Sequence, residues 1–509
     1  MFWADRVASE LKDKGPQWVD DMKTPSGRIH VGALRGVIIH DLVFRALKDP
    51  KTPAKYTYII DDHDPMDSLP IYLDQEKYAP YMGVPLNKIP SPDGSQKSFA
   101  RYFAENFINV FNKLGCRPEI LWAWDFYTSG KIDKAIRTAL DNAEKIQDIY
   151  QKVSGSQKKE AGWYPFQVIC EKCGKLGTTK VTAWDGKEVT YECLPDLVKW
   201  AQGCGFKGKI SPFSGKGKLP WKVEWPAVWS ILGVTIEGEG KDLASRGGAR
   251  DTANALCREV FKIKPPYDLP YEHFLIGGKK MSTSKGFGAS AQEMAEILPP
   301  QVLRFLMVKT DYKQAINFDP EGETILQLFD DYDRYAKEFF NHGNEDLSRV
   351  FELSQIDSTL PKKMTFPRFR EVATFVQMPG VDIKKQFPDA SPEILEERIK
   401  YAKIWLEKYA PEEKKFTVQK NLPPAAKILT TGQKELLLKI TQDVDKKWEP
   451  EDFQNHIYQL GKEAGLTSNE TFQAIYLALL GKNHGPKASW LILSLEKDFV
   501  QKRFQEAAK

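Results

Sequence analysis

The sequence predicts an α/β fold that is interrupted by a cysteine-bearing insert and followed by an all-α region. The first ~160 residues alternate between strand-like and helix-like patterns, which is typical of a parallel sheet. Four cysteines then lie within residues 163–210, and after residue 290 the apolar spacing is almost entirely helical. With 509 residues, the chain is long enough for three or four domains with substantial cores.

Composition is that of an ordinary soluble enzyme, with 28% charged and 41% hydrophobic residues. The net charge of +4 is compatible with local RNA-binding patches but is too small to indicate them. No apolar run approaches the length of a membrane span, and the first residues do not have the pattern of a signal peptide. We therefore expect a cytoplasmic protein without a membrane partner, in which cysteines serve as metal ligands more often than as disulfides.

The segment Thr24–Gly32 (TPSGRIHVG) precedes a predicted helix over residues 31–47. A strand, a glycine turn and a helix N-terminus form an anion site, since backbone N–H groups point outward there. Gly27 and Gly32 allow a nucleotide to approach the backbone, and His30 can donate a hydrogen bond to phosphate. Taken alone, His30 would be read as an ordinary turn histidine.

The segment Gly277–Gly286 (GGKKMSTSKG) is rich in hydrogen-bond donors, among them Lys280, Ser282, Ser284 and Lys285. Its flanking glycines favour a loop that can close over a triphosphate. The plain alternative is a solvated basic loop. Because the two segments occur together and in this order, we expect both to bind phosphate.

Acidic residues follow the second predicted strand, residues 55–60, in the run Asp61-Asp62-His63-Asp64. Ligands of open α/β sheets bind at the carboxyl ends of strands, so a cationic substrate group could sit here beside the nucleotide. Helical spacing follows in residues 99–114 and 132–153. Farther along the chain, Ser290 with Glu293 and Thr467 with Glu470 are capping boxes that predict helix starts.

Cys170 and Cys173 form a Cys-x-x-Cys half site, and Cys193 with Cys204 could complete a tetrahedral thiolate site for structural zinc. Four thiols without metal remain the alternative. Cys116 and Cys257 lie in helix-like contexts and are expected to be buried small hydrophobic residues.

With these motifs placed, the chain resembles class I lysyl-tRNA synthetases, the archaeal and scattered bacterial form. TPSGRIHVG and GGKKMSTSKG are similar to the HIGH and KMSKS signatures of class I. The resemblance extends through KLPWKVEWPAVW (residues 218–229), GVTIEGEGKD (233–242) and RGGARDT (246–252). It implies a Rossmann-like catalytic domain with a zinc insert and an anticodon-binding region.

The resemblance also implies functional residues. Catalytic roles fall to His30, Lys280 and Lys285, and ATP with Mg²⁺ would bind Gly27, His30, Gly32, Lys280, Ser282, Ser284 and Lys285, with the ribose near Asp242. Lysine would lie around Thr24, Trp221 and Tyr271. A partly buried ammonium needs a carboxylate, for which Asp62 and Asp64 are the candidates, and Trp221 could add a cation–π contact. Met22 and Leu243 depart from the glycine and histidine that line the family's pocket.

The expected reaction is ATP-dependent formation of lysyl-adenylate and transfer of lysine to tRNA(Lys). A glutamyl-type class I synthetase and a non-catalytic, zinc-bearing RNA-binding paralogue are the alternatives. The expected domains are a catalytic first half (1–160), the zinc-ribbon-like insert (161–215), a catalytic second half with the KMSKS loop (216–320) and a helical anticodon-binding region (321–509). A monomer is expected.

Overall fold

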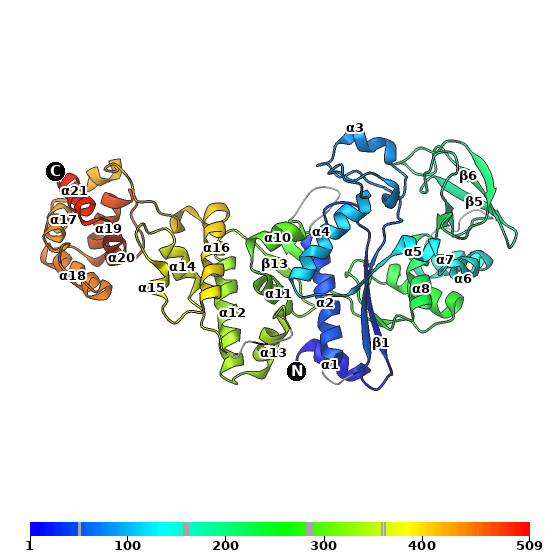
Figure 1. Cartoon of the computed structure of the whole chain (residues 1–509), viewed down its shortest axis with the longest axis horizontal. Helices are drawn as coiled ribbons and strands as arrows, with labels where there is room; N and C mark the ends of the chain where they lie inside the picture. The colour runs from blue at the N-terminus through cyan, green and yellow to red at the C-terminus, as the bar shows by residue number, and fades with distance from the viewer. Residues whose placement is uncertain (49–51, 156–161, 281–288, 358–359, 361–362) are drawn as a thin grey trace. The chain divides into compact units, whose positions relative to one another are not determined.

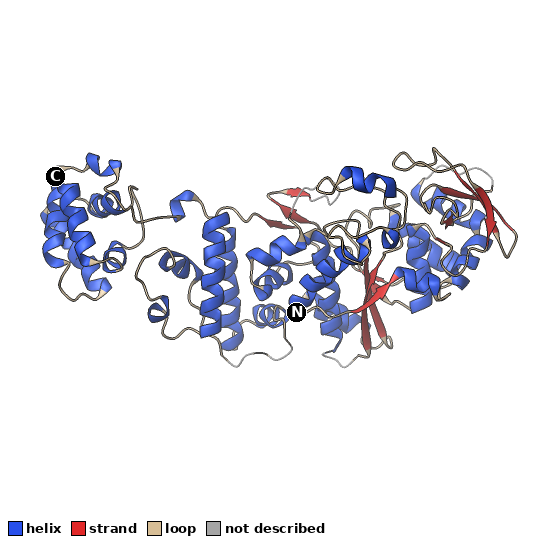
Figure 2. Cartoon of the chain, turned by 45° about the horizontal axis from the view of Figure 1, so that its top comes forward, coloured by secondary structure: helices blue, strands red, loops and turns tan. Residues whose placement is uncertain are grey.

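The computed structural model describes residues 1–48, 52–155, 162–280, 289–357, 360 and 363–509 (Figure 1). The chain forms two compact units. The first comprises Met1–Phe318 and Tyr335–Leu360, and the second comprises Asp319–Arg334 and Pro361–Lys509. Within the described residues, strands occur only in the first unit (Figure 2). Among all the described residues, no helix is both long and apolar enough to span a membrane.

A five-stranded sheet organises the first unit, and all of its pairings are parallel, as the sequence predicts. Its strands, in spatial order, are β10 (Tyr267–Asp268), β9 (Ile236–Glu237), β1 (Gln17–Lys23), β2 (Ala54–Ile60) and β3 (Glu119–Trp122). The central strand β1 pairs with β2 along its whole length, from Gln17 with Ala54 to Lys23 with Ile60. Because these strands are parallel, the carboxyl ends of β1, β2 and β9 lie at the same edge of the sheet.

Helices cover this sheet. α2 (Val31–Lys48) packs on β1 and β2 and against α1 (Trp3–Leu11), and it runs alongside β1 in Figure 1. On another side, Ile59 of β2 belongs to a core shared with α6 (Asp133–Asp141), α8 (Trp221–Leu232) and α9 (Ala249–Leu256). α4 (Phe99–Lys113) buries Phe99. Other helices of this unit are α3 (Gln75–Tyr78), α5 (Ala123–Thr128), α10 (Ala291–Ile297), α11 (Pro300–Val308) and α13 (Glu345–Leu353).

The helix predicted over residues 132–153 is wrong as one element. It is divided into α6 and α7 (Ala143–Ser154) at Asn142, which adopts a non-helical conformation. The Asn142 Nδ2 donates to the Thr138 carbonyl at 2.8 Å. A short amide side chain that bonds the local backbone competes with the helical ladder, and this explains the break.

The insert lies between α7 and α8 in the sequence. β5 (Thr179–Trp184), β6 (Val189–Cys193) and β7 (Lys207–Ile210) form an antiparallel sheet. β4 (Gln167–Val168) pairs with β8 (Gly217–Lys218) at the point where the chain enters and leaves the insert. Since Cys170 and Tyr191 share one hydrophobic core with Trp229 of α8, the insert packs on the rest of the first unit.

A small sheet of β11 (Phe274–Ile276), β12 (Lys279–Lys280) and β13 (Ile316–Phe318) follows. Its strand β13 is an exception to the helical pattern expected after residue 290. Ser290 and Thr467 both form the predicted capping boxes. The later helices are α12 (Thr324–Phe340), which contributes to both units, α14 (Phe369–Phe375), α15 (Ile383–Gln386), α16 (Pro392–Lys408), α17 (Thr431–Asp443), α18 (Pro450–Glu463), α19 (Ser468–Leu479), α20 (Ala488–Leu493) and α21 (Lys497–Ala508).

Candidate active site

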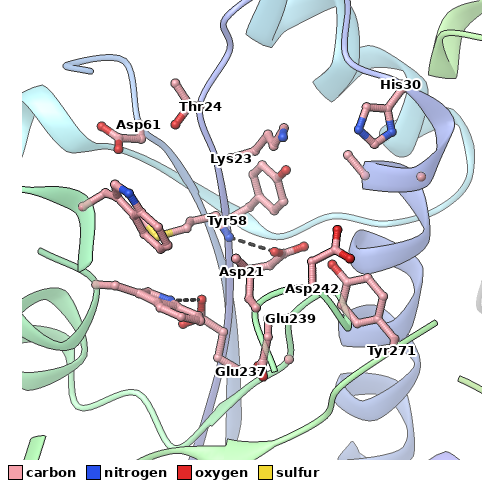
Figure 3. A pocket seen from close by; sticks show the side chains of 18 of the residues that line it. Asp21, Lys23, Thr24, His30, Tyr58, Asp61, Glu237, Glu239, Asp242 and Tyr271 are labelled. Atoms are coloured by element: carbon pink, nitrogen blue, oxygen red, sulfur yellow. Dashed lines mark hydrogen bonds between the residues drawn. The ribbon is translucent and has the colours of Figure 1, made fainter. Parts of the chain in front are cut away.

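A cavity of about 530 Å³ lies at the carboxyl ends of β1 and β9 and beside the start of α2 (Figure 3). This is the position at which open parallel sheets bind ligands. Carboxylates dominate the charged groups of its lining. The predicted site residues that line it are Thr24, His30, Gly32, Asp64, Trp221, Asp242 and Tyr271.

The two predicted phosphate-binding segments approach each other in the fold. His30 forms a backbone bridge with Ser290, and the Val31 N–H donates to the Ala289 carbonyl at 3.2 Å. The chain that follows GGKKMSTSKG is thereby held against the start of α2. The chain directly after the second motif therefore contacts the end of the first motif, whose His30 and Gly32 line the cavity.

Part of the second motif lies outside the described residues, namely Ser282, Ser284 and Lys285. The backbone of Lys280 belongs to β12 and pairs with Leu275. Gly27 belongs to the loop between β1 and α2 but is not among the residues that line the cavity. The roles assigned to these residues stay predictions.

Lys218 occupies the acidic cluster that the sequence offers to a cationic substrate. Its buried Nζ lies 3.1 Å from Asp61 and 3.2 Å from Asp64, and it also contacts Glu224. Burial acts to lower the pKa of Lys218, but the three carboxylates outweigh it and raise the pKa well above its usual value. Asp61, Asp64 and Glu224 lie close enough together to hold a metal ion, but the Lys218 ammonium pairs with all three of them.

Asp64 is nevertheless tied to the first motif, because the Thr24 hydroxyl donates to it at 2.7 Å. Asp62 is placed differently from the sequence expectation. It is not among the residues that line the cavity, and its carboxylate accepts from the Trp124 backbone N–H at 2.9 Å. Burial raises the pKa of Asp62 to about 6.

Other carboxylates line the cavity whose role was not predicted from the sequence, among them Asp21, Glu237 and Glu239. Burial raises the pKa of Asp21 and of Glu237 to about 7, and that of Glu239 to about 9. The alternation of strand residues and the acidic run GVTIEGEGKD were signals that could have placed them.

His40 lies behind Asp21 and is fully buried. Its Nε2 accepts from the Gly238 N–H at 2.8 Å, so its Nδ1 carries the proton and donates to the Gly36 carbonyl at 2.7 Å. Burial lowers the pKa of His40, which keeps the ring neutral. It therefore brings no positive charge to Asp21.

Tyr271 packs closely against α2. A Cβ added at Gly36 would lie 2.6 Å from the Tyr271 hydroxyl, so this helix position requires glycine to admit the ring. Asp242 lies 3.2 Å from His273 at the rim. Trp221, at the start of α8, is 43% exposed and is available to a ligand.

Trp225 and Trp229 belong to the core, and both donate their indole N–H groups to Glu237. Met22 and Leu243 also line the cavity, as the comparison of motifs implied. The walls therefore combine apolar side chains with buried carboxylates. Such a lining suits a ligand that has both methylene and ammonium groups.

The four insert cysteines lie with their sulfur atoms within 4.8 Å of one another. Cys170 Sγ is 3.6 Å from Cys204 Sγ, and Cys173 Sγ is 3.7 Å from Cys193 Sγ. Zinc–sulfur bonds of ~2.3 Å in a tetrahedron place the sulfurs about 3.8 Å apart. The donor set and its spacing therefore fit zinc. Cys116 and Cys257 are buried elsewhere, as expected.

Comparisons with known proteins follow the same division of the chain. Residues 1–357 match the family described as tRNA synthetases class I (K), and residues 385–508 match an anticodon binding domain. The chain is 35% identical to a lysine–tRNA ligase of Methanosarcina barkeri strain Fusaro over 540 residues, with 100% of this chain and 98% of the relative covered. It is 34% identical to the lysine–tRNA ligase of Archaeoglobus fulgidus, with 100% of each chain covered.

Among solved structures, a glutamate tRNA ligase from Elizabethkingia meningosepticum has a TM-score of 0.50 at 13% identity, covering 97% of this chain and 99% of the other. That likeness concerns the fold. The parallel sheet, the joined motif segments and the matches along the whole length agree with the fold class predicted from the sequence. The chain therefore belongs to the class I lysyl-tRNA synthetase family.

Proposed function

We propose that this protein activates L-lysine with ATP and transfers it to tRNA(Lys). The observation that carries the proposal is a carboxylate-rich cavity at the first motif, in a chain that resembles lysine–tRNA ligases over its whole length. A carboxylate-rich lining attracts an ammonium side chain and repels a second carboxylate. This argues against the glutamyl-type alternative.

ATP binds, in this proposal, at the start of α2. His30 and Gly32 line the cavity there, and helix N-terminal N–H groups favour phosphate. Asp242 holds the ribose at the opposite rim. The remaining ATP contacts are those implied by the motifs, from Gly27, Lys280, Ser282, Ser284 and Lys285.

Lysine binds beside the nucleotide, between Thr24, Asp64, Trp221 and Tyr271. The hydrogen bond from Thr24 to Asp64 links the motif loop to the acidic wall. Asp62 supports this wall from behind by holding the Trp124 backbone. Trp221 offers a ring face to the substrate cation.

The chemistry needs no protein nucleophile. The lysine α-carboxylate attacks the α-phosphorus of ATP and pyrophosphate leaves, which gives a mixed anhydride. The 2′-hydroxyl of the terminal tRNA adenosine then attacks the carbonyl, and AMP leaves. His30, Lys280 and Lys285 act by positioning the phosphates and balancing their developing charge, while Mg²⁺ bound with ATP would supply further screening.

One structural zinc is held, in this proposal, by Cys170, Cys173, Cys193 and Cys204 of the insert. The second unit binds the anticodon of the tRNA, consistent with the domain that matches residues 385–508. The domain limits 1–160, 161–215, 216–320 and 321–509, a monomeric state and a cytoplasmic location complete the proposal.

The test is ATP–pyrophosphate exchange against all twenty amino acids, with and without total tRNA, followed by tRNA charging. We expect exchange with lysine. Exchange with glutamate and none with lysine would support the glutamyl-type alternative. The absence of exchange with every amino acid, with tRNA present, would support the non-catalytic paralogue.

A further inference from the structure

Most carboxylates that line the cavity already have a cationic partner within the chain. Lys218 serves three of them, Asp61, Asp64 and Glu224. The other ion pairs are Glu239 with Arg250 and Glu272 with Lys241, and Asp242 lies 3.2 Å from the His273 ring. Among the described residues of the lining, Asp21 and Glu237 make no ion pair with a lysine or an arginine, although Lys23 acts electrostatically on Asp21 and Arg250 on Glu237.

Glu237 is saturated by neutral donors. Its Oε1 accepts from Trp225 at 2.6 Å, and its Oε2 accepts from Trp229. Both oxygens are therefore engaged within the core. Glu237 holds the tryptophans of α8 in place and has little capacity left for a substrate.

Asp21 is different. Its Oδ1 accepts from the Met22 N–H at 2.8 Å, and its Oδ2 lies 3.5 Å from the neutral His40 ring. The side chain is 11% exposed. Lys23 lines the same cavity, but its side chain extends away from the Asp21 carboxylate in Figure 3. A carboxylate buried in this way is costly unless a cation joins it.

A second acceptor faces the same region. Glu239 Oε2 is paired with Arg250, while its buried Oε1 accepts no hydrogen bond within the described residues. Both Asp21 and Glu239 act electrostatically on the hydroxyl of Tyr271. The two carboxylates thus converge on the part of the cavity beside Tyr271.

We propose that Asp21 is the counter-charge of the substrate ε-ammonium, with Glu239 Oε1 as a second hydrogen-bond acceptor. This assignment rests on the proposed function and names the specificity-determining residue of that site. The α-ammonium then lies toward Thr24 and Asp64, near the start of α2. Met22 and Leu243 supply apolar contact to the methylenes between the two ends.

Selectivity follows from the burial of Asp21. Norleucine has the same chain without the ammonium, so its binding would leave Asp21 without a cation or force it to take up a proton. A charged hydrogen-bond partner of this kind contributes ~10- to 100-fold in affinity. The site therefore selects a cationic side chain through one residue of β1.

The decisive variant is Asp21→Asn, which keeps the shape and removes the charge. In pyrophosphate exchange we expect the KM for lysine to rise roughly 10- to 100-fold, with the KM for ATP unchanged. The preference for lysine over norleucine should fall by the same factor. The matched control is Glu272→Gln, a carboxylate of the same lining that keeps Lys241 as its partner. This control should leave both constants within about twofold.

Measurements on the unaltered protein keep the inference testable if the variant does not fold. Calorimetry should show weaker lysine binding as the pH falls below about 7, by roughly tenfold per unit, because Asp21 takes up a proton. The other titratable groups that interact with Asp21 are Asp20, Lys23, His40, Tyr56, Tyr58 and Tyr271, and Glu237 and Glu239 share its cavity. Asp21→Asn should abolish the part of the pH dependence that belongs to Asp21.

The outcomes separate the two levels of the proposal. An unaltered enzyme that charges lysine, together with an Asp21→Asn variant of unchanged lysine KM, overturns the assignment of Asp21 alone. Equal calorimetric affinity for lysine and norleucine overturns it as well. An unaltered enzyme that does not use lysine overturns the proposed function itself.

Discussion

The acidic wall of the cavity depends on one ammonium, that of Lys218. It is 1% exposed and lies among Asp61, Asp64 and Glu224. Lys218→Met keeps the volume but leaves two buried carboxylates, Asp61 and Glu224, and the partly buried Asp64 without a cation. Because removal of one partner from a buried ion pair costs about 3–5 kcal/mol, we expect this loss in urea unfolding at pH 7.5. The exposed Lys216, changed to Met, should cost less than ~0.5 kcal/mol.

The loss at Lys218 should depend on pH in a defined direction. Without the lysine, burial raises the pKa of the folded carboxylates above their unfolded values. The contribution of these carboxylates to the free energy of unfolding of the variant is then greatest below about pH 4, and it is lost as the pH rises through their raised folded pKa values. A deficit relative to the unaltered protein that stays constant from pH 5 to pH 8 would contradict this account of the cluster.

A second residue-scale prediction concerns the lysines of the GGKKMSTSKG segment. If Lys280 and Lys285 bind the transition state more tightly than bound ATP, their alanine variants should lose ~10²–10³-fold in kcat, about 2.7–4 kcal/mol, with smaller changes in KM. Lys279→Ala should cost much less, since Lys279 lies outside the matched positions. Pre-steady-state adenylate formation decides the matter. An equal, small effect of all three variants would mean a solvated basic loop.

At the scale of elements, we expect the fold of the insert to depend on zinc bound by its four cysteines. Cys170 and Cys173 lie between β4 and β5, Cys193 ends β6, and Cys204 lies between β6 and β7. Cys170 and Cys193 pack in the core that includes Trp229. Cys170→Ser should lower bound zinc from one equivalent to less than half, destabilise the insert, and impair tRNA charging more than ATP binding.

Metal analysis, insert proteolysis and nucleotide binding measure these three effects. Cys257→Ser is the matched control, since this buried thiol lies outside the cluster and should leave the zinc content unchanged. Unaltered protein with less than half an equivalent of zinc, purified without chelator, would contradict the metal assignment. Equal loss of charging and ATP binding in Cys170→Ser would mean that the insert supports the catalytic core.

At the scale of the whole molecule, each unit has its own hydrophobic core. Phe453 is fully buried in the core of α17, α18, α19 and α21, whereas Ile136 belongs to the core around α8. Phe453→Ala should cost about 3–5 kcal/mol within the second unit because it leaves a cavity. We expect tRNA charging to fall while lysine-dependent exchange with saturating tRNA keeps its KM for lysine.

Ile136→Ala, which costs about 2–5 kcal/mol in the first unit, should instead lower exchange and charging together. Urea unfolding followed by both assays makes the comparison. A loss of exchange in Phe453→Ala as severe as in Ile136→Ala would show that lysine activation depends on the second core.

The sequence by itself determined what near neighbours control. Periodicity placed α2 and α4, the capping boxes placed the starts of α10 and α19, and cysteine spacing anticipated a four-thiolate cluster. Motif order and the resemblance indicated the family. These features succeed because helix starts, strand alternation and knuckle spacing depend on residues a few positions apart.

Only the tertiary structure decided which charges meet. Lys218 pairs with Asp61 across 157 positions, so the acidic run after β2 is neutralised by the chain, while Asp21 from the neighbouring strand faces the cavity without such a partner. His30 meets Ser290 in the same way. The physical reason is that the free energy of a buried charge depends on its surroundings in space, which local sequence patterns do not contain.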